Sequence, residues 1–162
     1  MKRIKRKYET PLHRFDKERI EGERGLLTAY GLKTKRELWV TESLLRKYRR
    51  LARELAAKKD KERERMLVDK MVRLGLINEN SQLDDVLGMN INNFLERRFQ
   101  MIVFRKGLAK SVNHARQLIT HGKVLIGEKK VKYPSYIVSR DEEGKIQLVS
   151  GLQPKTKVIQ NA

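Results

Sequence analysis

Residues 107–127 read GLAKSVNHARQLITHGKVLIG, and this stretch decides the fold. Gly107 is suited to end one helix, and Ser111 is a good N-cap for a second helix that finishes at Gly122. A short strand pattern follows and leads into a tight, glycine-first turn at Gly127. The sequence therefore predicts two helices followed by a β-hairpin.

The apolar positions of these two helices define their expected faces. In the first helix, we expect a core face formed by Leu95, Phe99, Ile102 and Val103, with Arg98 and Arg105 along its side. In the second helix, Val112, Ala115 and Ile119 are expected to face inward. The opposite face is predicted to be polar and free of acids, with Asn113, Arg116, Gln117 and Thr120.

Positive charge is concentrated in the same part of the chain. The 162 residues carry a formal net charge of +18. Residues 93–140 hold eleven Lys or Arg and two acids. A protein with such an excess of cations usually binds a polyanion, and nucleic acid is the polyanion that we favour. A membrane is disfavoured because the sequence has no long apolar run.

The hairpin is expected to carry a cationic rim at Lys129 and Lys130. Lys132 and two tyrosines, Tyr133 and Tyr136, follow it, and the tyrosines would either stack on unpaired bases or belong to the core. A last hairpin that turns at residues 141–144 would add residues 146–149 to a small sheet.

A long helix is predicted before this module. Thr34 and Glu37 have the spacing of a capping box. In this motif the threonine side chain accepts from a first-turn amide, and the glutamate side chain accepts from the threonine amide. A continuous apolar stripe is expected at Leu44, Tyr48, Leu51 and Leu55. The cations on the other faces solvate the helix or, as we favour, contact phosphates: Arg46, Lys47, Arg49, Arg50 and Arg53.

Composition divides the chain into parts. Residues 74–92 contain no Lys or Arg and three acids, and they include a short helix capped near Ser81 and ending at Gly88. We expect a basic arm at 1–20, a mostly helical region at 21–92, the module at 93–150 and a tail at 151–162. The fold class is α+β, with a short antiparallel sheet in the module.

The arm holds eight Lys or Arg against three acids. Such an arm orders on a polyanion, although a neighbouring protein is an alternative partner. Its candidate contacts are Lys2, Arg3, Lys5, Arg6 and Lys7. No apolar segment of a secretory signal follows these cations, so a cytoplasmic location is expected.

Several kinds of chemistry are disfavoured. The chain has no cysteine, and its three histidines are not flanked by carboxylates at metal-ligand spacing. We therefore expect no metal, no cofactor and no catalytic residue.

Five motifs together resemble the RNA-binding domain of the small-ribosomal-subunit protein four family. They are residues 95–98 (LERR), 107–111 (GLAKS), 114–118 (HARQL), 121–124 (HGKV) and 134–138 (PSYIV). The similarity continues upstream to residues 30–32 (YGL), 35–37 (KRE) and 84–88 (DDVLG), in the manner of the archaeal and eukaryotic branch. It extends from about Pro11 to Val149.

The resemblance implies a structural, non-enzymatic protein of the small subunit. It would bind a multi-helix junction of small-subunit ribosomal RNA and promote assembly beside neighbouring proteins, numbers three and five, with no small-molecule substrate. It implies RNA contacts at Arg97, Arg98, Lys110, Ser111, His114, Arg116, Gln117, His121, Lys123, Ser135 and Tyr136. The residues themselves add Arg105, Lys106, Asn113, Lys129, Lys130, Lys132 and Tyr133.

The sequence departs from the bacterial pattern of this family in two places. The zinc site of some bacterial members cannot form without cysteines, and Gly127-Glu128 replaces the common Asn-Gly turn. Two alternatives stay open: an assembly factor of the same family that leaves mature subunits, and an RNA-modifying enzyme or synthetase that carries the module as an appendage.

Overall fold

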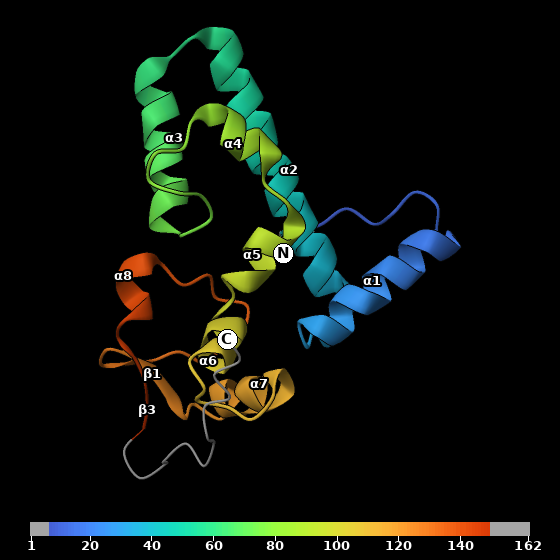
Figure 1. The fold of residues 1–162 in the computed structure, drawn as a ribbon. Coiled ribbons are helices and arrows are strands. Elements are labelled where there is room, and N and C mark those ends of the chain that lie inside the picture. Colours follow the sequence, from blue (N-terminus) through green and yellow to red (C-terminus); the bar gives the residue numbers. More distant parts are fainter. Residues whose placement is uncertain (1–6, 150–162) are drawn as a thin grey trace, which may run out of the picture.

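The computed structural model describes residues 7–149 (Figure 1), so the expected tail at 151–162 lies outside them. Helices dominate, and a small sheet lies near the C-terminal end of this range. The helices are α1 (Lys17–Ala29), α2 (Lys35–Lys58), α3 (Lys61–Arg73), α4 (Leu83–Gly88), α5 (Ile91–Glu96), α6 (Phe99–Arg105), α7 (Val112–Thr120) and α8 (Arg140–Glu143). The strands are β1 (Val124–Ile126), β2 (Lys129–Lys130) and β3 (Ile146–Leu148). The α+β class is confirmed.

The long helix α2 organises the N-terminal part, and it contacts α1, α3, α4 and α5. Lys59 ends it in the left-handed conformation, and the side chain of Asp60 caps α3 by accepting from the Arg63 amide at 3.3 Å. The chain therefore reverses there, and Figure 1 shows α3 running back along α2.

The buried face of α2 differs from the expected stripe. Leu45, Ala52 and Leu55 are buried in the core shared with α3, α4 and α5, whereas Leu51 is exposed. Leu44 and Tyr48 pack at the edge of this core. The predicted stripe is therefore confirmed at Leu55 and, at the core edge, at Leu44 and Tyr48, but it was wrong at Leu51, where Ala52 is buried instead.

Both ends of the α3–α4 connection use local hydrogen bonds. Gly75 has a φ of +68°, and its amide donates to the Val72 carbonyl at 2.8 Å, which closes the C-terminal end of α3. The N-cap of α4 is Gln82 rather than the expected Ser81. The Asp85 side chain accepts from the Gln82 amide at 2.9 Å, so the reciprocal bond that fixes the helix start lies one residue later.

The single helix expected around residues 95–103 is two helices, α5 and α6, with a break at Arg97 and Arg98. Arg98 is extended, with a ψ of 140°, and forms a β-bridge with Ile137. The break lets Leu95 pack with Leu32 and Leu38 of the helical region. Phe99, which follows the break, packs instead in a different core.

The module after the break has its own core. Phe99, Ile102, Ala115, Ile119 and Val124 are completely buried there, and they come from α6, α7 and β1. This confirms the inward faces expected for Ala115 and Ile119.

The sheet has the order β2-β1-β3, with both pairings antiparallel. Ile126 pairs with Lys129 across the two-residue turn, and Gly127 adopts a φ of +59°, which confirms the glycine-first hairpin. The prediction that the segment at 146–149 joins a small sheet is confirmed by β3, but the hairpin predicted before it was wrong. Residues 140–143 form α8 instead, because Ser139 and Glu142 make a capping box, and β3 pairs with β1 rather than with the segment before it.

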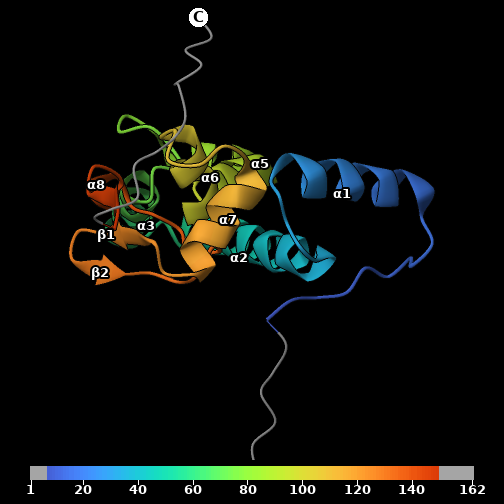
Figure 2. The same cartoon turned by 90° about the horizontal axis from the view of Figure 1, so that it is seen from below.

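The N-terminal segment is shorter than the expected arm, because α1 begins at Lys17 with Asp16 as its cap. Figures 1 and 2 show α1 projecting from the body on the side away from the sheet. Before α1, the ring of Tyr8 lies 5.9 Å from that of Trp39 on α2. Among the helices of residues 7–149, none combines the length and apolar character that crossing a membrane requires.

Candidate nucleic-acid interface

The start of α7 is fixed by two local hydrogen bonds. The Ser111 hydroxyl accepts from the His114 amide at 3.1 Å, which confirms Ser111 as the N-cap. The Lys110 amide donates to His114 Nδ1, also at 3.1 Å. An acceptor nitrogen carries no proton, so neutral His114 has its hydrogen on Nε2. Lys110 is therefore exposed at this end of α7, next to a backbone that these two hydrogen bonds hold in place.

Lysines surround the hairpin at the far end of α7. Lys123 precedes β1, Lys129 and Lys130 form β2, and Lys132 follows it, and all four side chains are exposed. None of them forms an ion pair with a carboxylate among residues 7–149. This end of the module therefore carries cations that are available to an external anion.

The two tyrosines differ in their surroundings. Tyr133 is 73% exposed, so of the two expected roles the core role is wrong for this side chain. Tyr136 is 38% exposed, and its hydroxyl donates to Glu142 at 2.8 Å, which raises the pKa of the tyrosine. Tyr133 thus presents a free ring beside Lys132, whereas Tyr136 has its polar end tied to α8.

Arg116 does not lie free on the polar face of α7. Its guanidinium donates to Glu37 on α2 through Nη2 at 2.8 Å and through Nη1 at 3.2 Å. The prediction of an open polar face was therefore wrong at this position. Asn113, Gln117 and Thr120 are exposed as expected.

Arg97 and Arg98 are buried, which contradicts the expectation that Arg98 lies along an exposed helix side. Arg98 donates to Glu37, and Arg97 donates to Glu143 at 2.7 Å and to the Val138 carbonyl at 2.9 Å. Both guanidinium groups thus already have protein acceptors, so we interpret them as structural residues. Their contact with RNA stays an untested prediction.

Glu37 is the shared acceptor of this cluster. Burial alone would raise the pKa of its carboxyl, but the hydrogen bonds and charges of Arg116 and Arg98 hold the pKa below its usual range. The expected capping box is wrong here, because Thr34 makes no side-chain cap and Glu37 turns toward the module instead.

Gln100 completes the junction and was missed by the sequence reasoning. It is fully buried, and its amide donates to the Gly31 carbonyl at 3.0 Å and to the Val112 carbonyl at 3.1 Å. A polar residue among the apolar positions of α6 was the available signal. These bonds join the α1–α2 turn, α6 and α7 into one unit.

Arg105 and Lys106 at the end of α6 are exposed but not free. Arg105 pairs with Glu96 at 3.3 Å, and Lys106 donates to the Glu143 carbonyl. An exposed ion pair is weak and is readily exchanged for another anion. These residues remain compatible with RNA contact. His121 and Ser135, also predicted contacts, are exposed as well.

The cations of α2 form a second basic surface. Arg46, Lys47, Arg50 and Arg53 line one concave surface with Ser43 and Glu9. Arg49 is excluded from it, because its guanidinium donates to the Met89 carbonyl and holds α2 against the chain between α4 and α5. Of the predicted arm contacts, Lys7 is exposed, whereas Lys2, Arg3, Lys5 and Arg6 lie outside the described residues.

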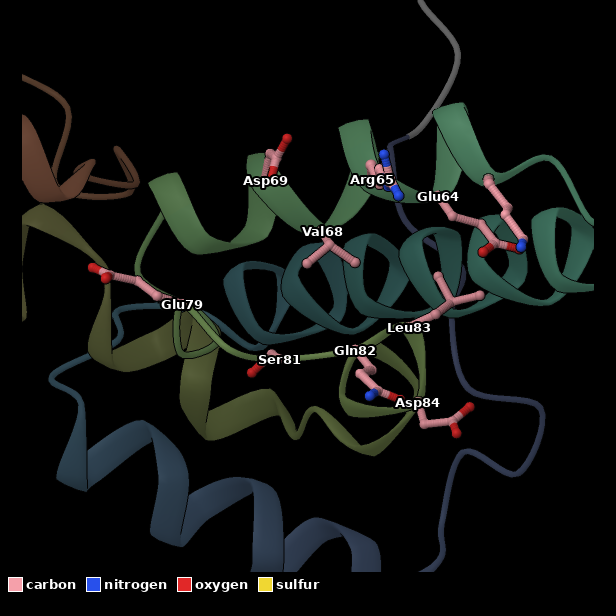
Figure 3. Close-up of a pocket in the computed structure, with 10 residues that line it drawn as sticks. Glu64, Arg65, Val68, Asp69, Glu79, Ser81, Gln82, Leu83 and Asp84 are labelled. Carbon is pink, nitrogen blue, oxygen red and sulfur yellow. The ribbon is translucent and has the colours of Figure 1, made fainter.

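A pocket between α3 and the α4 segment has a different character (Figure 3). Val68 and Leu83 form its apolar part, and its rim carries both signs of charge: Lys61, Glu64, Arg65, Asp69, Glu79 and Asp84. Such a surface offers phosphates no net attraction. Within the described range, no group of three His, Asp or Glu side chains is placed to hold a metal ion.

Comparison with known proteins identifies a domain within this part of the chain. The S4 domain, an RNA-binding domain, matches residues 97–143. The small ribosomal subunit protein uS4 of Ignicoccus hospitalis is 48% identical over 143 residues, which cover 86% of each chain. The uS4 proteins of Nanoarchaeum equitans and Sulfurisphaera tokodaii are 45% and 47% identical, and cover 92% and 88% of this chain and 86% and 82% of their own. The chain belongs to the uS4 family.

An ion pair joins the two ends of the matched S4 range in this uS4-family chain. The matched range begins at Arg97 and ends at Glu143, the two residues that form the 2.7 Å ion pair. The α2 surface lies outside that range. The uS4-family chain therefore displays two basic surfaces, one on the S4 domain and one on the helical region.

Proposed function

We propose that this protein is a structural constituent of the small ribosomal subunit that binds small-subunit ribosomal RNA. The observation that carries the proposal is the set of exposed lysines around α7 and the hairpin, which have no carboxylate partner among the described residues. Free cations on a preorganised module are suited to phosphates. The uS4 relatives are themselves named as small-subunit proteins.

The RNA target in this proposal is a multi-helix junction, and binding promotes subunit assembly. Two basic surfaces on one chain support this, because they can contact different RNA helices at once. Hydrogen bonds around Glu37 and Gln100 connect the two parts that carry these surfaces. We further propose small-subunit proteins three and five as neighbours, and the ribosome in the cytoplasm as the location. No reaction, cofactor or small-molecule substrate is part of the proposal.

A filter-binding titration tests it. The full-length protein is titrated onto a ribosomal RNA fragment that contains the junction, and onto the same fragment with one junction helix unpaired. We expect preferential binding to the intact junction. Affinity should fall by roughly 10³ to 10⁵ between 50 and 200 mM salt if about six to ten phosphates are contacted. A flat salt response, or equal binding to both RNAs, contradicts junction binding.

Sedimentation distinguishes a permanent constituent from an assembly factor. A constituent should remain on mature small subunits after a high-salt wash. Presence only on immature particles would favour the assembly factor.

A further inference from the structure

Four cations line the basic surface of α2: Arg46, Lys47, Arg50 and Arg53. The carboxylate of Glu9 lines it as well, and on the helix itself Glu42 lies 4.0 Å from Arg46 and Glu54 lies 3.3 Å from Arg50. Arg46, Arg50 and Arg53 follow a spacing of four and then three residues, so they lie on one side of the helix. They span about 10 Å along the axis at 1.5 Å per residue. A row of this kind fits the backbone of a nucleic-acid strand.

Glu9 and the residue before it contact one face of α2. Its carboxylate lies 3.1 Å from Arg46 Nη1, and its amide donates to the Ser43 hydroxyl at 3.3 Å. The preceding residue, Tyr8, lies against Trp39. Trp39, Ser43 and Arg46 are successive positions on one face of α2. The N-terminal segment therefore follows this face and places its anion at the first cation of the row.

The Glu9–Arg46 pair is open to exchange. The side chains are 79% and 55% exposed, respectively, and an ion pair at such a surface contributes little to stability. A phosphate offers arginine a bidentate acceptor of higher charge density. An incoming phosphate can therefore replace the glutamate without disturbing the core.

We propose that Glu9 occupies the position of an RNA phosphate on α2 and is displaced when the RNA binds. In the free protein, Glu9 orients Arg46 and weakens the binding of other anions to the cations of α2. In the complex, Arg46 contacts a phosphate and the Glu9 carboxylate moves into solvent. This proposal rests on the proposed RNA-binding function and deepens it.

A double-mutant cycle tests the displacement. The variants are Glu9→Gln, Arg46→Gln and the double variant, each as the full chain with the junction RNA at constant salt. Glu9→Gln should tighten binding by about two- to fivefold, which corresponds to the exchange of one exposed ion pair. In the Arg46→Gln background, Glu9→Gln should have no effect on affinity, since Glu9 then no longer competes with the RNA for Arg46.

Glu64→Gln is the matched control. It makes the same change of charge at the mixed pocket on α3 and should leave affinity unchanged. Thermal unfolding of every variant shows whether the fold is intact.

Three results would overturn the proposal. Weaker binding by Glu9→Gln would mean that Glu9 positions the row for RNA rather than competing with it. Tighter binding that persists with Arg46→Gln, or that Glu64→Gln also causes, would mean a general effect of charge. Unchanged binding would mean that Arg46 meets no phosphate. If the wild-type protein itself does not bind the junction RNA, the proposed function fails instead.

Discussion

Arg116 and Glu37 lie 79 residues apart in the chain and form a bidentate ion pair, with Nη2–Oε1 at 2.8 Å and Nη1–Oε2 at 3.2 Å. The pair connects α7 of the S4 domain to α2 of the helical region. Arg98, which is 4% exposed, donates to the same carboxylate. One glutamate therefore balances two guanidinium groups at the junction of the two parts.

Replacement of Glu37 by Gln should destabilise the protein by about 2 kcal/mol. The amide can still accept a hydrogen bond, but the buried Arg98 loses its counter-charge. Urea unfolding followed by circular dichroism measures the loss. Glu128→Gln is the control, because Glu128 is exposed at the hairpin tip and forms no ion pair among residues 7–149. Equal midpoints for both variants would show that the Glu37 cluster is not a stabilising contact.

The contribution of Glu37 should disappear in acid. Its pKa in the folded protein lies below the ordinary value of 4.5, because the attraction of the arginines outweighs burial. Folding therefore favours the charged form, and the stabilisation is fully present above the unfolded pKa and is lost as the pH falls through the folded pKa. Unfolding curves of wild type and Glu37→Gln should differ at pH 7 and converge at lower pH. A difference that stays constant from pH 7 to pH 3 would contradict this.

Arg116 and Gln117 are neighbours on α7 but should respond differently to truncation. Arg116→Ala leaves Glu37 with one arginine and should lower stability by about 1–3 kcal/mol. Gln117→Ala changes an exposed side chain and should shift stability by less than about 0.5 kcal/mol. Thermal unfolding of both single variants distinguishes them. A drop caused by Gln117→Ala alone would show that this face is covered.

Much of the S4 domain could be predicted from local signals in the sequence. Ser111 as the cap of α7, Gly107 after α6 and the turn at Gly127 all depend on residues next to one another in the chain. Such features are decided within a few residues, so a single sequence suffices to find them. The inward positions of Ala115 and Ile119 follow from the same short range.

The errors at the candidate interface involve contacts between distant segments. Glu37 has the spacing of a capping residue, and only the docking of α7 onto α2 turns it toward Arg116. Arg97 and Arg98 look like exposed cations, yet the pairing of this segment with Ile137 and Val138 buries them. The charge of an arginine is visible in a sequence, but its partner is not. The sequence therefore identifies the cations of the candidate interface, but it does not distinguish those that pair with a carboxylate of the protein from those that do not.

Gly31 should not tolerate alanine. Its φ is +56°, and a Cβ there would lie 2.8 Å from Gln100 Nε2, whose side chain is fully buried and hydrogen-bonded. Strain and crowding together should cost more than about 2 kcal/mol. Gly22→Ala in α1 is the contrasting variant, since nothing lies within 4 Å of the added carbon. It should stabilise the protein by about 0.5–1 kcal/mol. Similar unfolding midpoints for the two variants would contradict the close docking of Gly31.

The lysines of β2 provide the most direct test of the S4-domain surface. Lys129→Gln with Lys130→Gln removes two exposed cations that form no ion pair among residues 7–149. If both contact phosphates, the slope of log affinity against log salt should become shallower by roughly 1.5 to 2. Stability should hardly change, because both side chains are exposed and their sheet bonds use the backbone. Lys61→Gln with Arg65→Gln removes the same charge from the mixed pocket on α3 and should leave the slope as it is. An equal change of slope in both double variants would show that net charge, rather than this strand, governs RNA binding.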